Sequence, residues 1–416
     1  MNMRLGLLGE RLGHSYSPMI YELMGLPGYE IFPMSKGKIS SFLKEDRLRG
    51  INVTVPYKKT IMQFCDTLSQ NAKKLANVNT LLFESDGSIR GYNTDYDGFV
   101  YMIKKSGFCL KGKKVIVLGT GGASQTVKFA CLDAGARKVI SVSRSGENNY
   151  GNILCHKDAE ILVNATPVGM YPHEENTPIS LEKFECLEGV ADLIYNPLRT
   201  SLLTEATRLG IAAIGGLAML IEQARKAAEL FGGESIAEEE TLRICRILQE
   251  KNENIVIIGM PGSGKTVIGA QIAKNMNRGF VDTDELLKER TRRSAAEWID
   301  EYGEEVFREK EAEIVREAAL GRGIVIATGG GAVLKEENRT ALRRNGRVYW
   351  LRRPLEQLET EGRPLSENLP ELFERRRPLY SQAADVAVDI CDKIDISAKK
   401  IQEEFYAYIS AQWTEY

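Results

Sequence analysis

The pattern of apolar and polar positions repeats one arrangement twice along the chain. An apolar run, a glycine-rich turn and a helical stretch follow one another in Lys114–Val127 and again in Asn254–Ile268. In each case a buried strand leads directly to the N-terminus of a helix, which is typical of the opening unit of a parallel α/β domain. The pattern therefore predicts two α/β regions in one polypeptide.

Further elements are predicted around these two units. β-Branched residues predict a strand at Gly50–Val55, which Pro56 ends. Apolar positions at helical spacing predict helices between residues 217 and 250, with a break at Gly232-Gly233. The polar stretch Lys251–Asn254 follows, and we place the main domain boundary there. So short a tether is expected to hold the two halves close together.

Composition narrows the class of protein. A chain of 416 residues exceeds one ordinary domain, so two or three domains are expected. The 55 basic and 57 acidic side chains nearly cancel, which argues against nucleic acid as a partner. Seven scattered cysteines without a CxxC pair indicate a reducing compartment, and no apolar run has the length of a membrane span. With no secretory pattern at the start of the chain, we expect a cytoplasmic location without membrane partners.

The second glycine turn is a complete phosphate-binding motif. The eight residues 259–266, GMPGSGKT, fit G-x-x-x-x-G-K-[ST] between a strand and a helix. Glycines let backbone N–H groups surround phosphate oxygens, Lys265 can reach the β- and γ-phosphates, and the Thr266 hydroxyl can ligate Mg²⁺. The motif predicts ATP and Mg²⁺ binding through Gly262, Ser263, Gly264, Lys265 and Thr266.

Carboxylates, glycines and arginines downstream suggest a small anionic acceptor. Asp282 and Asp284 follow a predicted strand, where an extended chain would place both carboxylates on one side. One could hold Mg²⁺ and the other could accept a proton from a substrate hydroxyl. Gly329–Gly331 follow the next strand and allow close approach of a ligand. Three arginines suit carboxylate or phosphate binding, although each alone could be solvated surface: Arg308, Arg363 and Arg376.

Residues 254–416 resemble shikimate kinase. The motifs GMPGSGKT, FVDTDELL, EEVFREKEAEI, IATGGGAV, GRPL and RRRPLY occur in that family's order. The resemblance implies that Asp282 supports the metal, that Asp284 is the candidate base, and that Arg363 comes from a lid over the transferred phosphoryl group. It also implies that shikimate is bound by Arg308, Gly330, Gly331 and Arg376. The lid stretch Pro354–Arg363 is shorter than usual, with Glu359 or Thr360 where the family has an adenine-stacking arginine, so the contacts to the base are expected to differ.

The first glycine turn predicts a dinucleotide. Gly119-Thr-Gly121-Gly122-Ala123-Ser124 is a variant of the Rossmann turn, in which Ser124 takes the place of the third glycine. After the next predicted strand the chain has no acidic residue for a ribose 2′-hydroxyl. It has Ser143, Arg144 and Ser145, which suit a 2′-phosphate and favour NADP(H), although Arg144 could also be plain surface charge.

Upstream polar residues form a candidate acid–base site. Lys58 follows the strand that ends at Pro56, and Asp95 could orient it. Ser15 and Ser17 offer two hydroxyls from one loop. Each residue also has an ordinary structural interpretation, with Asp95 as a helix N-cap, Ser17 as a turn residue and Lys58 as exposed charge.

Residues 3–232 resemble shikimate dehydrogenase. The motifs HSYSP, INVTVPYK, ANVNTL, GYNTDYDGF, GTGGAS, VNATPVGM, DLIYNP and GGLAMLIEQA occur in that family's order. The resemblance implies Lys58 and Asp95 as the acid–base pair, and Gly119, Gly121, Gly122, Ala123 and Arg144 as NADP ligands. It implies substrate binding by Ser15, Ser17, Thr54, Asn79, Tyr195 and Gln223. Ser143 replaces a usual asparagine, and the short segment 146–157 is expected to hold a reduced helix.

Together these observations predict an α/β protein with three domains. Residues 1–98 plus 216–250 would form the substrate-binding catalytic lobe, residues 99–215 a Rossmann NADP-binding lobe, and residues 254–416 a P-loop kinase domain of the α/β/α type. The predicted function is reduction of 3-dehydroshikimate by NADPH followed by phosphorylation of shikimate by ATP. The alternatives are a quinate/shikimate dehydrogenase fused to the kinase, and a non-catalytic ligand-sensing regulator.

Overall fold

The computed structural model describes residues 4–414 except 11, 14, 46 and 359–368. The chain forms two compact units, one of residues 1–196 and 200–245 and the other of residues 197–199 and 246–416. The division falls inside helix α8 (Glu239–Asn252), between Cys245 and Arg246. The polar stretch 251–254 is therefore not a separate tether, because it ends α8 and opens strand β12 (Asn254–Gly259).

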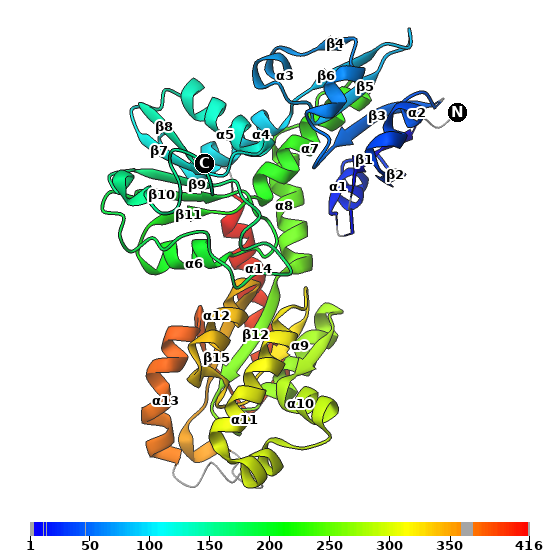
Figure 1. Ribbon diagram of the computed structural model, residues 1–416. Coiled ribbons are helices and arrows are strands. Elements are labelled where there is room, and N and C mark those ends of the chain that lie inside the picture. The colour runs from blue at the N-terminus through cyan, green and yellow to red at the C-terminus, as the bar shows by residue number, and fades with distance from the viewer. Residues whose placement is uncertain (1–3, 11, 14, 46, 359–368, 415–416) are drawn as a thin grey trace. The chain divides into compact units, whose positions relative to one another are not determined.

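The first lobe of the N-terminal unit is built on a six-stranded mixed sheet (Figure 1). Its strand order is β2-β1-β3-β5-β6-β4, and β5 runs antiparallel to both of its neighbours. The strands are β1 (Arg4–Gly9), β2 (Tyr29–Pro33), β3 (Leu48–Val53), β4 (Thr67–Leu68), β5 (Thr80–Phe83) and β6 (Ile89–Tyr92). The helices are α1 (Ser17–Leu23), α2 (Ile39–Phe42) and α3 (Gln70–Leu75).

The second lobe of this unit is a parallel five-stranded sheet with the order β11-β10-β9-β7-β8. Its strands are β7 (Lys114–Leu118), β8 (Lys138–Val142), β9 (Ile161–Asn164), β10 (Gly189–Asp192) and β11 (Ala212–Ile214). The helices in this part of the chain are α4 (Asp95–Ser106), α5 (Gly122–Asp133) and α6 (Ser201–Arg208), and the helix after β11, α7 (Leu217–Gly232), packs against α4 and also contacts α1, β3 and β5 of the first lobe. Strand β7 lies between β8 and β9, so the strand order reverses beside the glycine turn that follows β7. In open α/β sheets, ligands bind at the carboxyl ends of the strands at such a reversal.

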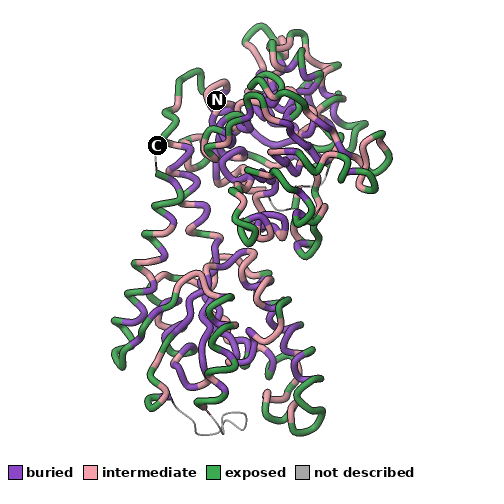
Figure 2. Tube along the Cα trace, turned by 90° about the vertical axis from the view of Figure 1, so that its left-hand side faces the viewer, coloured by how far each residue is buried: buried purple, intermediate pink, exposed green. Residues whose placement is uncertain are grey.

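The C-terminal unit is a parallel five-stranded sheet with the order β13-β14-β12-β15-β16. Besides β12, the strands are β13 (Phe280–Asp282), β14 (Val325–Ala327), β15 (Gly346–Arg352) and β16 (Val386–Asp389). The helices are α9 (Lys265–Met276), α10 (Thr283–Thr291), α11 (Ala295–Ala319), α12 (Glu336–Arg344), α13 (Leu369–Ala383) and α14 (Ile394–Gln412). In Figure 2 the buried residues of this unit concentrate on its central strands.

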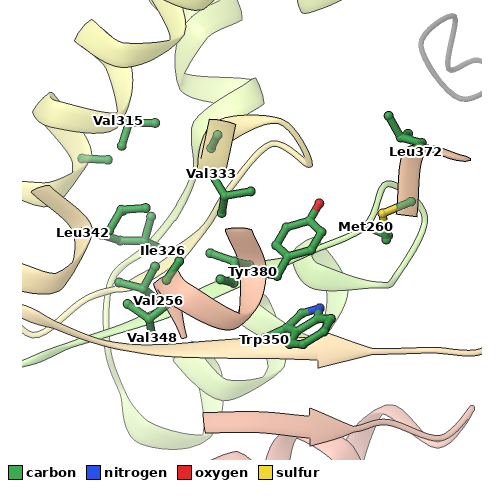
Figure 3. Close-up of a cluster of buried hydrophobic side chains, with 14 of the residues drawn as sticks. Val256, Met260, Val315, Ile326, Val333, Leu342, Val348, Trp350, Leu372 and Tyr380 are labelled. Atoms are coloured by element: carbon green, nitrogen blue, oxygen red, sulfur yellow. The ribbon is translucent and has the colours of Figure 1, made fainter. Parts of the chain in front are cut away.

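The core of the C-terminal unit reaches the candidate site through one aromatic pair. Val256 and Val348 from neighbouring strands pack in the cluster that Figure 3 shows, and the Trp350 ring stacks on Tyr380 of α13 with centroids 5.7 Å apart. The Tyr380 hydroxyl leaves the apolar cluster and donates to the Gly330 carbonyl at 2.6 Å. The core therefore fixes the loop that follows β14. None of the described helices is long and apolar enough to cross a membrane.

Candidate active sites

The N-terminal unit contains a cavity of about 250 Å³ between its two lobes. Its wall includes every side chain that the sequence assigned to substrate or to acid–base work in this half: Ser15, Ser17, Thr54, Lys58, Asn79, Asp95, Tyr195 and Gln223. Ala123 of the dinucleotide turn lines the same cavity. Residues from both lobes thus meet in one place.

An ion pair lies at the centre of this cavity wall. Lys58 Nζ is 2.7 Å from Asp95 Oδ2, and the two side chains are 18% and 9% exposed. The other Asp95 oxygen accepts from Asn79 Nδ2 at 3.0 Å, while Asn79 Oδ1 accepts from the Thr94 backbone N–H at 2.8 Å. The N-cap of α4 is Thr94, so the structural interpretation of Asp95 as an N-cap is wrong. Its carboxylate is free to face Lys58.

The other polar groups are arranged around this pair. Ser15 Oγ donates to Ser17 Oγ at 3.0 Å at the start of α1, which leaves two hydroxyls together on one loop. Gln223 of α7 donates to the Leu220 carbonyl at 2.8 Å, and its Oε1 is 3.5 Å from Asn79 Nδ2. Hydroxyl and amide groups held in this way suit a small polyhydroxylated carboxylate.

Asn52 is a wall residue to which the sequence motifs assigned no role. Its Oδ1 accepts from the Tyr21 and Tyr29 hydroxyls at 2.6 and 2.7 Å, and its Nδ2 donates to Thr80 Oγ1 at 3.0 Å. Two phenol donors on one oxygen fix the orientation of the amide. Asn52 belongs to the INVTVPYK motif, but its tyrosine partners are more than twenty residues away in sequence, so no local pattern shows them. An apolar part of the wall was also missed: Leu7, Val53, Leu193, Met219 and Leu220.

The dinucleotide turn has the geometry that a pyrophosphate needs. Gly119 has φ +107°, which L side chains rarely adopt, and a Cβ there would lie 3.1 Å from the Ala165 carbonyl. Gly121 is the N-cap of α5, so Gly122 and Ala123 present backbone N–H groups at the helix N-terminus. A Cβ on Gly121 would meet nothing within 4 Å, so space is open above the turn. Ser124, in the place of the third glycine, donates to the Gly119 carbonyl at 2.5 Å.

Ser143, Arg144 and Ser145 follow β8, next to the strand that carries the turn. The Ser143 N–H donates to the Asn148 carbonyl at 3.1 Å, while Arg144 and Ser145 are exposed. Arg144 makes no hydrogen bond or ion pair with the residues that the structure describes. The segment 146–157 contains one 3-10 helix, Ile153–His156, in agreement with the expected reduction.

The C-terminal unit contains a second cavity, of about 430 Å³. It is lined by ten residues that the sequence assigned to ATP, metal or acceptor: Gly262, Gly264, Lys265, Thr266, Asp282, Asp284, Arg308, Gly330, Gly331 and Arg376. Lys265 Nζ donates to the Gly259 and Met260 carbonyls at 3.0 and 2.8 Å. Ser263 does not line the cavity, because it is fully buried in the turn. Arg363, Glu359 and Thr360 lie outside the described residues.

The two carboxylates after β13 differ in backbone. Asp282 ends the strand and caps α10, accepting the Asp284 N–H at 2.9 Å, whereas Asp284 lies in the first helical turn. The expectation of an extended chain across both residues is therefore wrong, although both still face the cavity. Asp282 Oδ2 also accepts from Thr266 Oγ1 at 2.6 Å. One hydroxyl and one carboxylate fit Mg²⁺, which usually takes few protein ligands and completes its shell with phosphates and water.

Arg308 is held by acidic neighbours on its own helix. Its guanidinium contacts Glu311 at 2.8 Å and Glu304 at 2.9 Å. Burial lowers the pKa of Arg308, but the two glutamates more than offset this and raise it overall. Burial raises the pKa of Glu311, and Arg308 opposes that shift. A Cβ on Gly331 would lie 2.2 Å from Arg308 Nη1, so only glycine leaves room for the guanidinium.

Arg376 of α13 is the second arginine of this cavity. Its Nη1 donates to the Gly330 carbonyl at 3.1 Å, beside the Tyr380 hydroxyl. Burial lowers the pKa of Arg376 and raises that of Tyr380 to about 12. Three further residues line this cavity without having been predicted from the sequence: Ile299 and Phe307 of α11, and Lys288 of α10. In sequence, the two apolar residues have the spacing of ordinary core positions on a helix, and the lysine has that of an ordinary surface position.

Fold and sites together define a class of protein. The chain combines an α/β dinucleotide-dependent oxidoreductase with a P-loop phosphotransferase. Comparisons with known proteins are more specific. The family model described as shikimate dehydrogenase substrate binding domain matches residues 7–81, and the one described as shikimate kinase matches residues 261–406.

The N-terminal half is similar to several known proteins. A shikimate dehydrogenase (NADP(+)) of Clostridium beijerinckii is 35% identical over 245 residues, which are 54% of this chain and 90% of that protein. The structure of a chorismate mutase/shikimate 5-dehydrogenase fusion protein from Clostridium acetobutylicum has a TM-score of 0.57 and 34% identity, covering 60% of this chain and 98% of that one. The shikimate 5-dehydrogenase of Thermus thermophilus, in complex with NADP(H) and shikimate, has a TM-score of 0.53 and 32% identity, covering 57% and 97%.

The chain belongs to the shikimate dehydrogenase family over its N-terminal part, and its C-terminal part is a shikimate kinase domain. It is a bifunctional shikimate-pathway enzyme with NADP, ATP and Mg²⁺ as cofactors. The predictions of fold class, of the two enzyme activities and of these cofactors are confirmed.

Proposed function

We propose that the N-terminal unit reduces 3-dehydroshikimate to shikimate with NADPH, and that the C-terminal unit transfers the γ-phosphoryl group of ATP to the shikimate 3-hydroxyl. The observation that supports the first reaction best is the Lys58–Asp95 pair, 2.7 Å apart in a cavity with two serine hydroxyls and three side-chain amides. The second is supported by Arg308 and Arg376 beside Asp284 in the P-loop cavity. The product of the first reaction is the substrate of the second.

In the reduction, the protein's own groups position the ketone and supply a proton. Lys58 Nζ donates a proton to the carbonyl oxygen as that oxygen becomes a hydroxyl, and Asp95 keeps the ammonium oriented. Ser15 and Ser17 bind the substrate carboxylate, while Thr54, Asn79, Tyr195 and Gln223 bind its hydroxyls. When bound, NADPH supplies the hydride; Gly119, Gly121, Gly122 and Ala123 hold its pyrophosphate, and Ser143, Arg144 and Ser145 hold its 2′-phosphate.

In the phosphorylation, Arg308 and Arg376 bind the carboxylate of shikimate and Gly330 and Gly331 lie against its ring. Asp284 accepts the proton of the attacking hydroxyl. Lys265 exchanges its two carbonyl partners for phosphate oxygens, and Gly262, Ser263 and Gly264 supply backbone N–H groups. Thr266 and Asp282 would hold Mg²⁺, which would supply positive charge beside the phosphates, and Arg363 would stabilise the transferring group.

We assign the domains according to the two proposed reactions. We assign residues 1–98 plus 216–250 to the catalytic lobe of the dehydrogenase, residues 99–215 to its NADP-binding lobe, and residues 254–416 to the kinase. We assign helix α7 to the first of these because it contacts α1, β3 and β5 of that lobe.

The decisive experiment supplies the purified chain with 3-dehydroshikimate, NADPH and Mg·ATP. We expect shikimate 3-phosphate, with NADPH oxidation and ADP release in equal amounts. Without ATP, the only product should be shikimate. NADPH oxidation without any phosphorylated product would contradict the kinase assignment, and efficient oxidation of quinate would favour the quinate/shikimate dehydrogenase alternative.

Single substitutions separate the two reactions. Lys58→Ala removes the proton donor and should lower the kcat of reduction by about a hundredfold or more, a typical loss for a general acid. Its phosphorylation rate should be unchanged. Lys265→Ala should abolish phosphorylation and leave the rate of reduction unchanged. Loss of both activities from either change in folded protein would show that the two sites are not independent.

A further inference from the structure

Three consecutive residues contact three parts of the N-terminal site at once. Asn77 Nδ2 donates to the Gly122 carbonyl at 3.2 Å, at the start of α5 in the dinucleotide turn. The Val78 N–H donates to the Lys58 carbonyl at 2.9 Å, and Asn79 Nδ2 donates to Asp95 Oδ1 at 3.0 Å. These contiguous peptide units therefore connect the dinucleotide turn with the backbone of Lys58 and with the Asp95 carboxylate.

The Asn77 side chain has little freedom to do anything else. Asn77 is completely buried, and its backbone is held at both ends: the backbone N–H donates to the Ala72 carbonyl at 3.4 Å, and the backbone carbonyl accepts from Asn93 Nδ2 at 3.1 Å. Turning the amide over would set its oxygen against the Gly122 carbonyl, so its orientation is fixed. Among the described residues, Asn77 Oδ1 has no hydrogen-bond partner. Such a buried, unsatisfied acceptor costs free energy, so this contact is poorly explained by stability alone.

Gly122 is the matching half of the contact. A Cβ on Gly122 would lie 2.9 Å from Asn77 Nδ2, so only glycine lets the amide approach this closely. The next residue, Ala123, lines the same cavity as Lys58 and Asp95. The turn that would hold the cofactor and the wall that would hold the ketone are therefore joined at Asn77.

We propose that Asn77 is a positioning residue for the reduction: it fixes the distance between the dinucleotide turn and the Lys58–Asp95 pair. The inference rests on the proposed reduction and adds a residue that touches neither substrate nor cofactor. Its consequence is that cofactor binding and hydride transfer depend on one hydrogen bond between the lobes. A small misplacement of reacting groups lowers the rate of transfer strongly.

The test uses the full chain carrying Asn77→Ala. We expect the kcat of reduction to fall about tenfold and the KM for NADPH to rise severalfold, with the KM for 3-dehydroshikimate changed less than twofold. With NADPH deuterated at the transferred position, the isotope effect on kcat should become larger, because hydride transfer becomes slower than the other steps. Phosphorylation and the thermal midpoint should stay unchanged, since the substitution removes an unsatisfied acceptor together with its hydrogen bond. A purely structural role would lower the midpoint and leave the isotope effect as it was.

Two further variants keep the test decisive. Asn77→Asp retains the size of the side chain but replaces the hydrogen-bond donor with an acceptor. Its kcat for reduction should be at least as low as that of Asn77→Ala. If Asn77→Ala does not fold, Asn77→Asp tests the proposal in its place. Gly122→Ala should slow reduction by pushing the amide away, and adding Asn77→Ala to it should cost less than a further twofold. Losses that simply multiply would overturn the proposal. Asn71→Ala, in helix α3 of the same lobe, is the matched control and should behave as wild type.

Failure of this inference can be told from failure of the proposed function. If the wild-type chain does not reduce 3-dehydroshikimate, the proposed reduction is wrong. If the wild type does so and the Asn77 variants match it within twofold in kcat, KM and isotope effect, the reduction stands and Asn77 has no positioning role.

Discussion

Asp192 is a carboxylate without exposed surface at the end of β10. Its Oδ1 accepts from Asn164 Nδ2 at 3.0 Å and from the Ile194 N–H at 3.1 Å, and its Oδ2 accepts from Thr200 Oγ1 at 2.7 Å. Burial raises the pKa of Asp192 to about 6, against the opposing effect of these three donors. Asn164 and Thr200 both donate hydrogen bonds to the Asp192 carboxylate. We therefore expect protonation of Asp192 to change the stability of the NADP-binding lobe.

The sign of the pH effect follows from the raised pKa. An unfolded aspartate titrates near pH 4, so between about pH 4 and pH 6 the folded chain binds the proton more tightly than the unfolded chain. The contribution of Asp192 to the free energy of unfolding is therefore full below pH 4 and falls by about 3 kcal/mol as the pH rises through 6. The amount by which wild type exceeds Asp192→Asn in free energy of unfolding should therefore decrease as the pH rises from 4 through 6.

Urea unfolding at pH 4, 5, 6 and 7, followed by circular dichroism, measures this difference. All three tryptophans, Trp298, Trp350 and Trp413, lie in the C-terminal unit, so tryptophan fluorescence provides an internal control that should not change between the two proteins. A difference independent of pH would mean that Asp192 stays ionised in the fold.

At the scale of single residues, sequence motifs predict which side chains meet but not how each is held. Lys58 and Asp95 were expected to pair, and they do. The tyrosine pair on Asn52 and the Asn77–Gly122 contact were not foreseen, because their partners lie far apart in the chain and no periodic pattern connects them. The role of Arg144 remains a prediction, since its expected partner is a phosphate of the cofactor.

At the scale of elements, the glycine loop after β14 is held from two sides. Tyr380 and Arg376 bind the Gly330 carbonyl, while Arg308 fills the space where a Gly331 side chain would be. Arg308 cannot easily retreat, because Glu304 and Glu311 hold its guanidinium. The loop, α11 and α13 therefore form one continuous wall of the cavity, which carries both arginines.

Gly331→Ala tests this wall. A Cβ at 2.2 Å from Arg308 Nη1 must displace the guanidinium. Loss of a hydrogen bond to a charged group costs about 1.5–3 kcal/mol, so we expect kcat/KM for shikimate to fall roughly 10- to 150-fold. Most of the loss should be in the KM for shikimate, and reduction should be normal. Gly279→Ala is a matched control in the same unit, because its Cβ would press only on the Ile324 side chain. An unchanged KM for shikimate in Gly331→Ala would show that Arg308 does not bind the acceptor.

Element boundaries were the less predictable part of the fold. The two strand–turn–helix units were evident from apolar runs ending in glycines, and both form as expected. Asp284 was expected on an extended chain, but Asp282 caps α10 and the helix begins at Thr283, so Asp284 is helical. The polar stretch 251–254 resembled a linker because surface helix ends and linkers share the same composition. The backbone hydrogen bonds that distinguish them are not encoded in composition.

At the scale of the whole molecule, the two cavities are chemically separate. Every residue that lines the first belongs to the N-terminal unit, and every residue that lines the second belongs to the C-terminal unit. Among the described residues, neither cavity takes a side chain from the other unit, so we expect each reaction to proceed without the other. Fusion by itself raises only the local concentration of shikimate near the kinase, which differs from enclosed transfer.

A complementation experiment distinguishes free diffusion from direct transfer of shikimate. Lys58→Ala and Lys265→Ala chains, mixed at equal concentration, contain one working site of each kind on different molecules. Because the described lining residues of each cavity come from a single unit, we expect the mixture to form shikimate 3-phosphate with the same lag as wild type at the same concentration of working sites. The lag is read from a continuous ADP assay started with 3-dehydroshikimate, NADPH and Mg·ATP. A markedly shorter lag for the wild type would mean that shikimate passes between the sites of one chain before it equilibrates with the solution, and that joining the two reactions in one polypeptide has a kinetic purpose.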